Sequence, residues 1–272
     1  ISVNSLSKSY LIAEKQAGLI GTINHFFSRK LKRVFAVNDI TFDIEEGEIV
    51  GFIGSNGAGK TTSLKMLCGL IHPSSGSIEV SGHQPFLRQR SFLRQITLVM
   101  GQKQQLIWDL PPLDSLRVNA AVYGLSEIEA KRRISELAAM LDLDAELTRP
   151  VRKLSLGQRM KAELLAALLH RPTLLFLDEP TLGLDINAQI RVREFLSEYN
   201  KKYGATILLT SHYMGDITSL CKRVLLIHQG ELFHDGSLNE LMNRLSPKRC
   251  VKVELLQDIP LKLFKPFGDV VQ

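Results

Sequence analysis

The sequence predicts an α/β protein whose core is a mainly parallel sheet wrapped by helices. Short β-branched segments alternate with helical patterns along most of the chain, which is typical of strand–helix–strand units. Between Leu110 and Pro150 the pattern becomes helical only, with Ile134, Leu137 and Leu141 at helical spacing. These two observations predict one sheet-based domain that contains a separate helical region.

The expected strands are short and apolar, and they cover residues 48–54, 96–100, 173–177, 206–210 and 224–227. Near the end of the chain, Ser237 and Glu240 have the spacing of a capping box and predict the start of a short helix. Beyond it, the alternation of Val251, Val253 and Leu255 predicts a strand of a small tail that is cut off at the end.

Composition sets the bounds of the interpretation. The 272 residues are 44% apolar and 23% charged, which is ordinary for a globular domain with a large core. We expect a chain that does not itself cross a membrane, because it has neither a long apolar run nor the apolar core of a signal peptide. Three scattered cysteines without metal-ligand spacing favour a reducing compartment. A net charge of +6 fits nucleic acid, anionic lipid or nucleotide partners and does not choose among them.

A glycine-rich loop, GSNGAGKT over residues 54–61, lies between a predicted strand and a predicted helix. It fits the phosphate-binding P-loop, and the bare pattern arises by chance in on the order of one per cent of chains this long. Its backbone amides can turn toward phosphate oxygens, Lys60 adds a full charge, and the Thr61 hydroxyl is placed to ligate magnesium. The residues expected to hold the phosphates are Gly54, Ser55, Asn56, Gly57, Ala58, Gly59, Lys60, Thr61 and Thr62.

An apolar strand that ends in two carboxylates agrees with this loop. Residues 174–177 are Leu-Leu-Phe-Leu, and Asp178 and Glu179 follow them. An isolated Asp-Glu pair is more often simply solvated, because adjacent side chains on a strand point to opposite faces. At a strand end that faces a bound nucleotide, however, Asp178 can hold magnesium and Glu179 can polarise an attacking water.

Further motifs connect the chain to one family. The segment KLSLGQ at 153–158 resembles the signature motif of the ATP-binding cassette (ABC) family, and the segment that ends at Asp185 resembles its D-loop. His212 follows a strand like the family's switch histidine, and Gln102 follows an earlier strand like its Q-loop glutamine. Because these elements occur in the family's order over about residues 1–236, the chain resembles an ABC transporter ATP-binding subunit.

The resemblance implies a dimer with two composite sites, formed with an identical or a paralogous subunit. Ser155 and Gly157 of one subunit would close over the γ-phosphate held by Lys60 of the other, with helix-terminal amides facing the anion. Leu156 replaces the motif's usual glycine, but the serine and the second glycine remain. Beyond the P-loop, the implied nucleotide contacts are Tyr10, Ser155, Gly157, Gln158 and Asp185.

The resemblance also implies Mg²⁺-dependent transfer of the ATP γ-phosphoryl group to water. Glu179 would be the general base, His212 would lie near the γ-phosphate, and Gln102 would sense the metal or the water. A lone histidine is more often structural, and Gln104 and Gln105 follow Gln102 closely, so these choices depend on the family's order. The implied metal ligands are Thr61, Gln102 and Asp178.

The same resemblance outlines the domains. Residues 1–236 would form the cassette, with an antiparallel β subdomain and a helical signature subdomain at about 103–170. Residues 237–272 would be a short appendage, cut short before its natural end. Tyr10 occupies the place where family members stack adenine, and Phe35 is the alternative platform.

An insert at residues 11–33 separates these two aromatic residues. We expect residues 17–33 to form an amphipathic helix at the membrane surface or against the permease, because Leu19, Ile20, Ile23, Phe26, Phe27 and Leu31 fall near one helical face. Four basic residues crowd the end of that helix, namely Arg29, Lys30, Lys32 and Arg33. The alternative is that its apolar face packs on the cassette's own sheet.

The function implied is ATP hydrolysis that powers transport through separate membrane-spanning permease subunits, with this chain peripheral on the cytoplasmic face. The early insert, Trp108 and Pro111 are similar to subunits of drug, polysaccharide or lipid exporters, and we expect Trp108 to dock a cytoplasmic helix of the permease. A buried core tryptophan is the alternative.

The rival functions are a non-transport ABC ATPase acting on the ribosome or DNA, and an inactive regulatory module. Ribosomal members usually carry two cassettes, and DNA-repair members carry long coiled coils, and the sequence has neither feature. Intact Lys60, Asp178, Glu179 and His212 disfavour the inactive module. We therefore expect no nucleic-acid partner.

Overall fold

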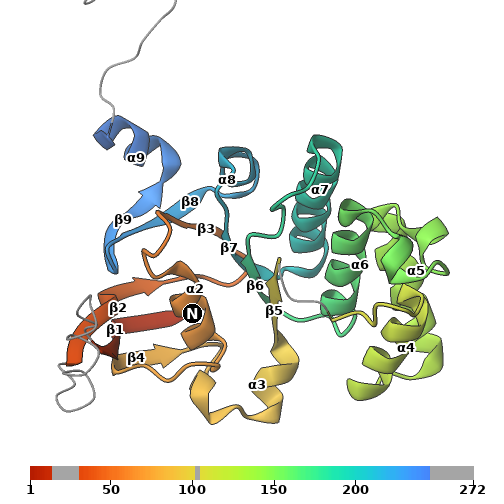
Figure 1. Cartoon of the computed structure of the whole chain (residues 1–272), viewed down its shortest axis with the longest axis horizontal. Coiled ribbons are helices and arrows are strands. Elements are labelled where there is room, and N and C mark those ends of the chain that lie inside the picture. Colours follow the sequence, from red (N-terminus) through yellow and green to blue (C-terminus); the bar gives the residue numbers. More distant parts are fainter. Residues whose placement is uncertain (14–30, 102–104, 246–272) are drawn as a thin grey trace, which may run out of the picture. The chain divides into compact units, whose positions relative to one another are not determined.

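The computed structural model describes residues 1–13, 31–101 and 105–245 (Figure 1). Contacts divide the chain into two compact units, Ile1–Leu238 and Asn239–Gln272. The described part of the first unit combines a mainly parallel sheet, an antiparallel sheet and several helices. The predicted α/β class is therefore confirmed.

The larger sheet carries the strands that were expected from the sequence. Among the described residues its strand order is β5 (Ile96–Met100), β6 (Leu174–Asp178), β7 (Thr206–Thr210), β3 (Ile49–Gly54), β8 (Arg223–His228) and β9 (Glu231–Ser237). All neighbours run parallel except β8 and β9, which are antiparallel. Because the central strands β6 and β7 are almost wholly buried, they consist of continuous apolar runs rather than alternating ones. Parallel strands end at one edge of the sheet, so β3, β6 and β7 bring their following loops together there.

The smaller sheet has the order β2 (Leu31–Asp43), β1 (Ser2–Ala13) and β4 (Ser75–Glu79), and it is antiparallel. Its β1–β2 hairpin corrects one prediction. Residues 31–33, expected at the end of an amphipathic helix, form a strand in which Leu31 pairs with Ala13 and Arg33 pairs with Leu11. Backbone hydrogen bonding to β1 satisfies this segment and overrides the helical spacing of its apolar residues. The rest of the expected helix lies outside the described residues.

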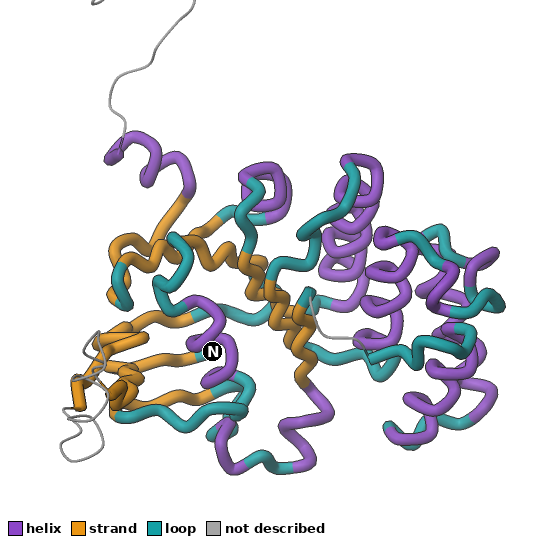
Figure 2. The backbone as a smooth tube through the Cα atoms, viewed as in Figure 1, coloured by secondary structure: helices purple, strands orange, loops and turns teal. Residues whose placement is uncertain are grey.

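Helices lie on both sides of the larger sheet, as the tube in Figure 2 shows. The first unit contains α2 (Lys60–Leu67), α3 (Arg90–Gln95), α4 (Pro112–Val122), α5 (Glu127–Leu141), α6 (Leu156–Leu168), α7 (Ile186–Tyr203) and α8 (Met214–Leu220), with 3₁₀ turns at Pro85–Leu87, Asp144–Glu146 and Val151–Lys153. The helices α4, α5 and α6 form the group that was expected between β5 and β6 (Figure 1). As the spacing predicted, Ile134, Leu137 and Leu141 of α5 are buried.

A charged cluster joins α5 to the end of α7. The carboxylate of Glu136 accepts hydrogen bonds from Arg171 at 2.6 Å and from the Tyr203 hydroxyl at 2.8 Å, and it pairs with Lys202 at 2.6 Å. These donors, Lys202 foremost, lower the pKa of Glu136 to about 2. The carboxylate is therefore ionised at neutral pH and stabilises the packing of the two helices.

The helix α9 (Leu238–Leu245) begins where Ser237 and Glu240 predicted it. The strand expected at 251–255 lies outside the described residues. Of the helices in the described ranges, none has both the length and the apolar character that a membrane crossing requires.

Candidate active site

The P-loop connects β3 to α2 and has a backbone that only glycine fits well. Gly54 and Gly59 have φ angles of 153° and 109°, and a Cβ atom on Gly59 would lie 2.3 Å from the carbonyl oxygen of Ala36. A Cβ atom on Gly57 would meet nothing within 4 Å, so this side of the loop borders open space. A glycine-rich loop at the start of a helix is the arrangement that binds phosphate through backbone amides.

Lys60 is the first residue of α2, and its side chain crosses the loop. Its ammonium group donates to the carbonyl oxygens of Gly54 at 2.8 Å and Ser55 at 3.0 Å. Burial lowers the pKa of Lys60, while the nearby carboxylates of Glu179 and Asp178 raise it. The structure thus places a cation between the loop and the acidic end of β6.

Asp178, the last residue of β6, links the P-loop to the neighbouring strand. Its carboxylate accepts hydrogen bonds from the Thr61 hydroxyl at 2.9 Å and from the Thr210 hydroxyl at 2.7 Å. Thr210 was not among the predicted site residues, although its position at a strand end, two residues before His212, was a usable signal. In the described part of the chain, no cluster of three or more His, Cys, Asp or Glu side chains could hold a metal ion. A cation here would therefore be held by few protein oxygens.

Glu179 and His212 meet beside this group. The Nε2 atom of His212 lies 2.8 Å from Oε1 of Glu179. The backbone of Glu179 has a φ angle of 55°, and its amide donates to the carbonyl oxygen of Thr210 at 3.2 Å. A left-handed conformation is uncommon at a non-glycine residue, and the contact to β7 holds Glu179 in it. The structure therefore brings together a carboxylate and a histidine that are far apart in the sequence.

The predicted Q-loop is only partly covered. Gln102 and Gln104 lie outside the described residues. Gly101, directly before them, donates its amide to the carbonyl oxygen of Asp178 at 3.1 Å, and the amide of Gln105 donates to the buried carboxylate of Glu163 at 2.7 Å. Glu163 was not predicted, because its partner is 58 residues away in the sequence. Both ends of this loop are thus fixed to the core.

The signature segment begins α6. Ser155 is the N-cap, and it forms a full capping box with Gln158: the Ser155 hydroxyl accepts from the Gln158 amide at 3.2 Å, and the Gln158 side chain accepts from the Ser155 amide at 2.9 Å. Leu156, which replaces the motif's glycine, is exposed and packs against the turn at Gly183. A Cβ atom on Gly183 would lie 3.3 Å from a methyl group of Leu156. The leucine therefore does not disturb the cap.

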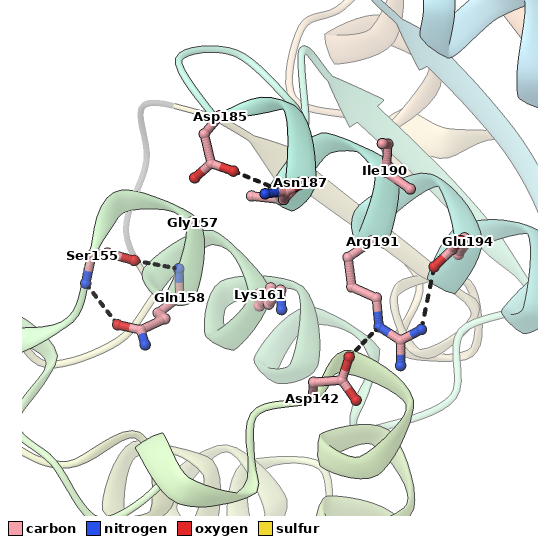
Figure 3. A pocket seen from close by; sticks show the side chains of 11 residues that line it. Asp142, Ser155, Gly157, Gln158, Lys161, Asp185, Asn187, Ile190, Arg191 and Glu194 are labelled. Atoms are coloured by element: carbon pink, nitrogen blue, oxygen red, sulfur yellow. Dashed lines mark hydrogen bonds and ion pairs between the residues drawn. The ribbon is translucent and has the colours of Figure 1, made fainter.

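A pocket of about 490 Å³ opens between the starts of α6 and α7 (Figure 3). Ser155, Gly157 and Gln158 line it from one side, and Asp185 lines it from the other. Asp185 caps α7 by accepting from the Ala188 amide at 2.9 Å. No described residue of the P-loop lines this pocket, so the signature segment faces a space separate from the one at Lys60.

The two candidate adenine platforms lie on the β1–β2 hairpin. Phe35 pairs with Ser9, and Tyr10 pairs with Val34. Because paired residues share a face and successive residues alternate, Tyr10 and Phe35 point to opposite faces of the hairpin. Both residues are a little under half exposed, and the ammonium group of Lys8 lies 5.3 Å from the centre of the Tyr10 ring. Only one of the two can face a given ligand.

The fold and this site define a P-loop nucleotide-binding protein, and comparison with known proteins identifies the family. The ABC transporter family matches residues 37–182. The ABC transporter ATP-binding protein NatA of Bacillus subtilis is 37% identical over 215 residues, which cover 79% of this chain and 87% of NatA. The Nod factor export ATP-binding protein I of Burkholderia thailandensis is 35% identical over 86% of this chain and 76% of its own length.

A solved structure agrees with these relatives. The structure of an ATP-binding subunit of an ABC transporter is 30% identical and superimposes with a TM-score of 0.72 over 90% of this chain and 92% of its own. The chain therefore belongs to the ABC transporter family, and it is an ATP-binding and ATP-hydrolysing subunit of that family. The family resemblance that the motifs indicated is confirmed.

Proposed function

We propose that this chain powers export through separate permease subunits, working as a dimer on the cytoplasmic face of the membrane. The observation that carries the proposal is the meeting of Lys60, Asp178, Glu179 and His212 at one sheet edge, next to the P-loop. Export, rather than import, is supported by the likeness to a Nod factor export protein.

The P-loop amides and Lys60 are the proposed ATP phosphate ligands. The Thr61 hydroxyl and the Asp178 carboxylate, 2.9 Å apart, are the hard oxygen donors that Mg²⁺ prefers, and such sites leave the remaining positions to phosphate and water. Held by these two residues, Mg²⁺ would supply positive charge that stabilises the phosphates. Tyr10 is the proposed adenine platform, and Gln102 the proposed sensor of the metal or water.

Hydrolysis is proposed to depend on Glu179 and His212. Glu179 accepts a proton from the attacking water, and His212 orients that carboxylate through the 2.8 Å contact and lies near the γ-phosphate. Lys60 places positive charge beside the phosphoryl group, where it stabilises the negative charge of the transition state. Catalysis comes mainly from positioning and charge, since phosphoryl transfer requires little covalent chemistry from the protein.

The pocket at Ser155 is the proposed contact with a second ATPase subunit. Its Ser155, Gly157 and Gln158 face a space that no P-loop residue of the same chain lines. The start of α6 carries partial positive charge, so it suits the γ-phosphate of a nucleotide held by a partner. Asp185 borders the same pocket and is proposed to belong to this interface.

The export function is tested by purifying the assembled complex through this chain and reconstituting it in liposomes. We expect ATP-dependent movement of cargo out of the compartment that the ATPase subunit faces. ATP hydrolysis that responds to ribosomes or DNA and not to the permease would instead support the non-transport alternative.

Trp108 is the proposed docking point for a cytoplasmic permease helix. Its side chain is 45% exposed, which argues against the core alternative, and the guanidinium of Arg159 lies 5.3 Å from the ring centre. In the reconstituted complex, we expect Trp108→Ala to lower transport roughly 10-fold, as for loss of an aromatic anchor, while the isolated subunit keeps its ATPase rate and melting temperature. Leu87 provides a matched control, since Leu87→Ala removes another exposed apolar side chain elsewhere on the surface. Parent-like transport by Trp108→Ala would remove the residue from the interface.

The end of the β1–β2 hairpin is the proposed membrane contact. Both of its faces are apolar and uncovered by other described residues: Leu11 and Leu31 lie on one face, Ile12 lies on the other, and Lys32 and Arg33 add positive charge. We expect the chain to float with anionic liposomes at low salt. Replacing Lys32 and Arg33 with glutamine should weaken binding several-fold for each residue, because a basic group near an anionic leaflet contributes about 1 kcal/mol.

The control for this assay is Lys131→Gln with Arg132→Gln, an exposed basic pair on α5. This variant loses the same charge far along the chain from the hairpin, and we expect it to bind like the parent. Equal losses in both variants would mean that net charge, rather than the hairpin, drives the binding.

A further inference from the structure

Asp216 is a buried carboxylate that the proposed mechanism does not yet use. It lies in the first turn of α8 and its side chain is 1% exposed. It accepts hydrogen bonds from the hydroxyls of Ser211 and Thr181, both at 2.5 Å, and from Nε of Arg193 at 2.6 Å. A buried charge is tolerated only when such partners compensate its desolvation, so these contacts hold their donors firmly.

Two of these donors lie next to the hydrolytic pair. Ser211 directly precedes His212, and Thr181 is the second residue after Glu179. Both hydroxyls reach the same oxygen, Oδ2 of Asp216. The carboxylate therefore ties together the loop after β6 and the loop after β7, and these loops carry Glu179 and His212.

The third donor leads to the proposed dimer interface. Nη2 of Arg193 donates to the side chain of Gln189 at 3.1 Å, and Gln189 donates to the carbonyl oxygen of Leu184 at 3.2 Å. Leu184 directly precedes Asp185, which lines the pocket at the signature segment. A continuous chain of buried or half-buried polar contacts thus runs from that pocket to Asp216.

We propose that Asp216 is a positioning residue for hydrolysis: it fixes the spacing of Glu179 and His212 and couples that spacing to the turn at Asp185. The inference builds on the roles proposed above for Glu179 and His212. A carboxylate accepts from all three donors at once, from the two hydroxyls on Oδ2 and from Arg193 on Oδ1. A neutral amide has a single acceptor oxygen, so it would present its NH₂ group to the remaining donor.

The test is Asp216→Asn, compared with the parent in steady-state ATPase and nucleotide-binding assays. We expect kcat to fall roughly 10-fold or more, with the dissociation constant for ATP changed by less than about 2-fold, since the P-loop contacts are untouched. A role in stability alone would lower the melting temperature and leave kcat per folded molecule unchanged. That result would overturn the proposal.

Glu136→Gln is the matched control, because Glu136 of α5 is also a carboxylate with three side-chain donors, two of which lie at the C-terminal end of α7. It should lower the melting temperature without changing kcat. If Asp216→Asn does not fold, Thr181→Val tests the positioning role instead. It removes one donor to Asp216 and keeps the ion pair between Asp216 and Arg193. We then expect a fall in kcat of about 3-fold, and parent-like turnover overturns the proposal.

A double variant tests the coupling. If Arg193 acts through Asp216, then Arg193→Gln combined with Asp216→Asn should lower kcat little more than Asp216→Asn alone, whereas fully additive losses overturn the coupling. Glu179→Gln separates this inference from the proposed function. A dead Glu179→Gln enzyme with parent-like Asp216→Asn refutes only the positioning role, whereas a fully active Glu179→Gln enzyme refutes the catalytic assignment itself.

Discussion

Glu179→Gln is expected to lower ATP turnover by roughly 100-fold or more while ATP binding persists, which is the scale for losing a positioned general base. Glutamine has the same shape as glutamate and keeps a polar contact with His212, but it cannot accept the proton of water. The contacts of Lys60 to the P-loop and of Asp178 to Thr61 do not involve this side chain. Binding and chemistry should therefore separate cleanly in this variant.

The measurements are steady-state phosphate release and binding of a fluorescent ATP analogue. With hydrolysis blocked, we also expect ATP to shift the variant to a dimer in size-exclusion chromatography. Glu198→Gln is the matched control, because it removes an exposed carboxylate on α7. Hydrolysis by Glu179→Gln within a few-fold of the parent would assign the base to another group.

The sheet could be predicted because each strand is encoded locally. The runs at 49–54, 174–178 and 206–210 are short, apolar and bounded by glycine or polar residues, and they are buried on both faces as such runs require. The P-loop was recognisable for a related reason. Its glycines meet backbone constraints that are local to the loop and its neighbours, so the motif and the geometry coincide.

The hairpin and the polar network could not be predicted in the same way. Residues 31–33 end a stretch, 17–33, whose apolar residues have helical spacing, and only pairing with β1, about twenty residues earlier in the sequence, makes them a strand. Likewise, Asp178 meets Thr61 across 117 residues of sequence, and Asp216 meets Thr181 across 35. Composition and periodicity carry no information on such pairings, which depend on the order of strands in the sheet.

The second large effect is expected from mixing two inactive variants. Lys60→Met removes the cation of the P-loop, and Ser155→Arg places a bulky cation where the α6 terminus would meet phosphate. Each variant alone should hydrolyse ATP at least about 100-fold more slowly than the parent, because transition-state charge loses its stabilisation in both sites.

In a dimer with composite sites, a mixed pair contains one doubly damaged site and one intact site. Equal mixing with free exchange makes half of the dimers mixed, so activity should recover to about a quarter of the parent rate if the two sites act independently. A recovered rate below a quarter of the parent rate, but clearly above the rate of either variant alone, would mean that the two sites hydrolyse ATP cooperatively. Mixing Lys60→Met with the parent provides the control for subunit exchange.

A dimer of Lys60→Met with the parent also keeps one intact site. If that dimer hydrolyses ATP, no recovery on mixing the two variants would contradict the composite site. The reason lies in the geometry of the single chain: the pocket at Ser155 and Gly157 contains no P-loop residue, so a site completed within one chain would need the signature segment to reach Lys60 by itself. Complementation between the two inactive variants therefore measures directly whether a second subunit supplies the residues at the start of α6.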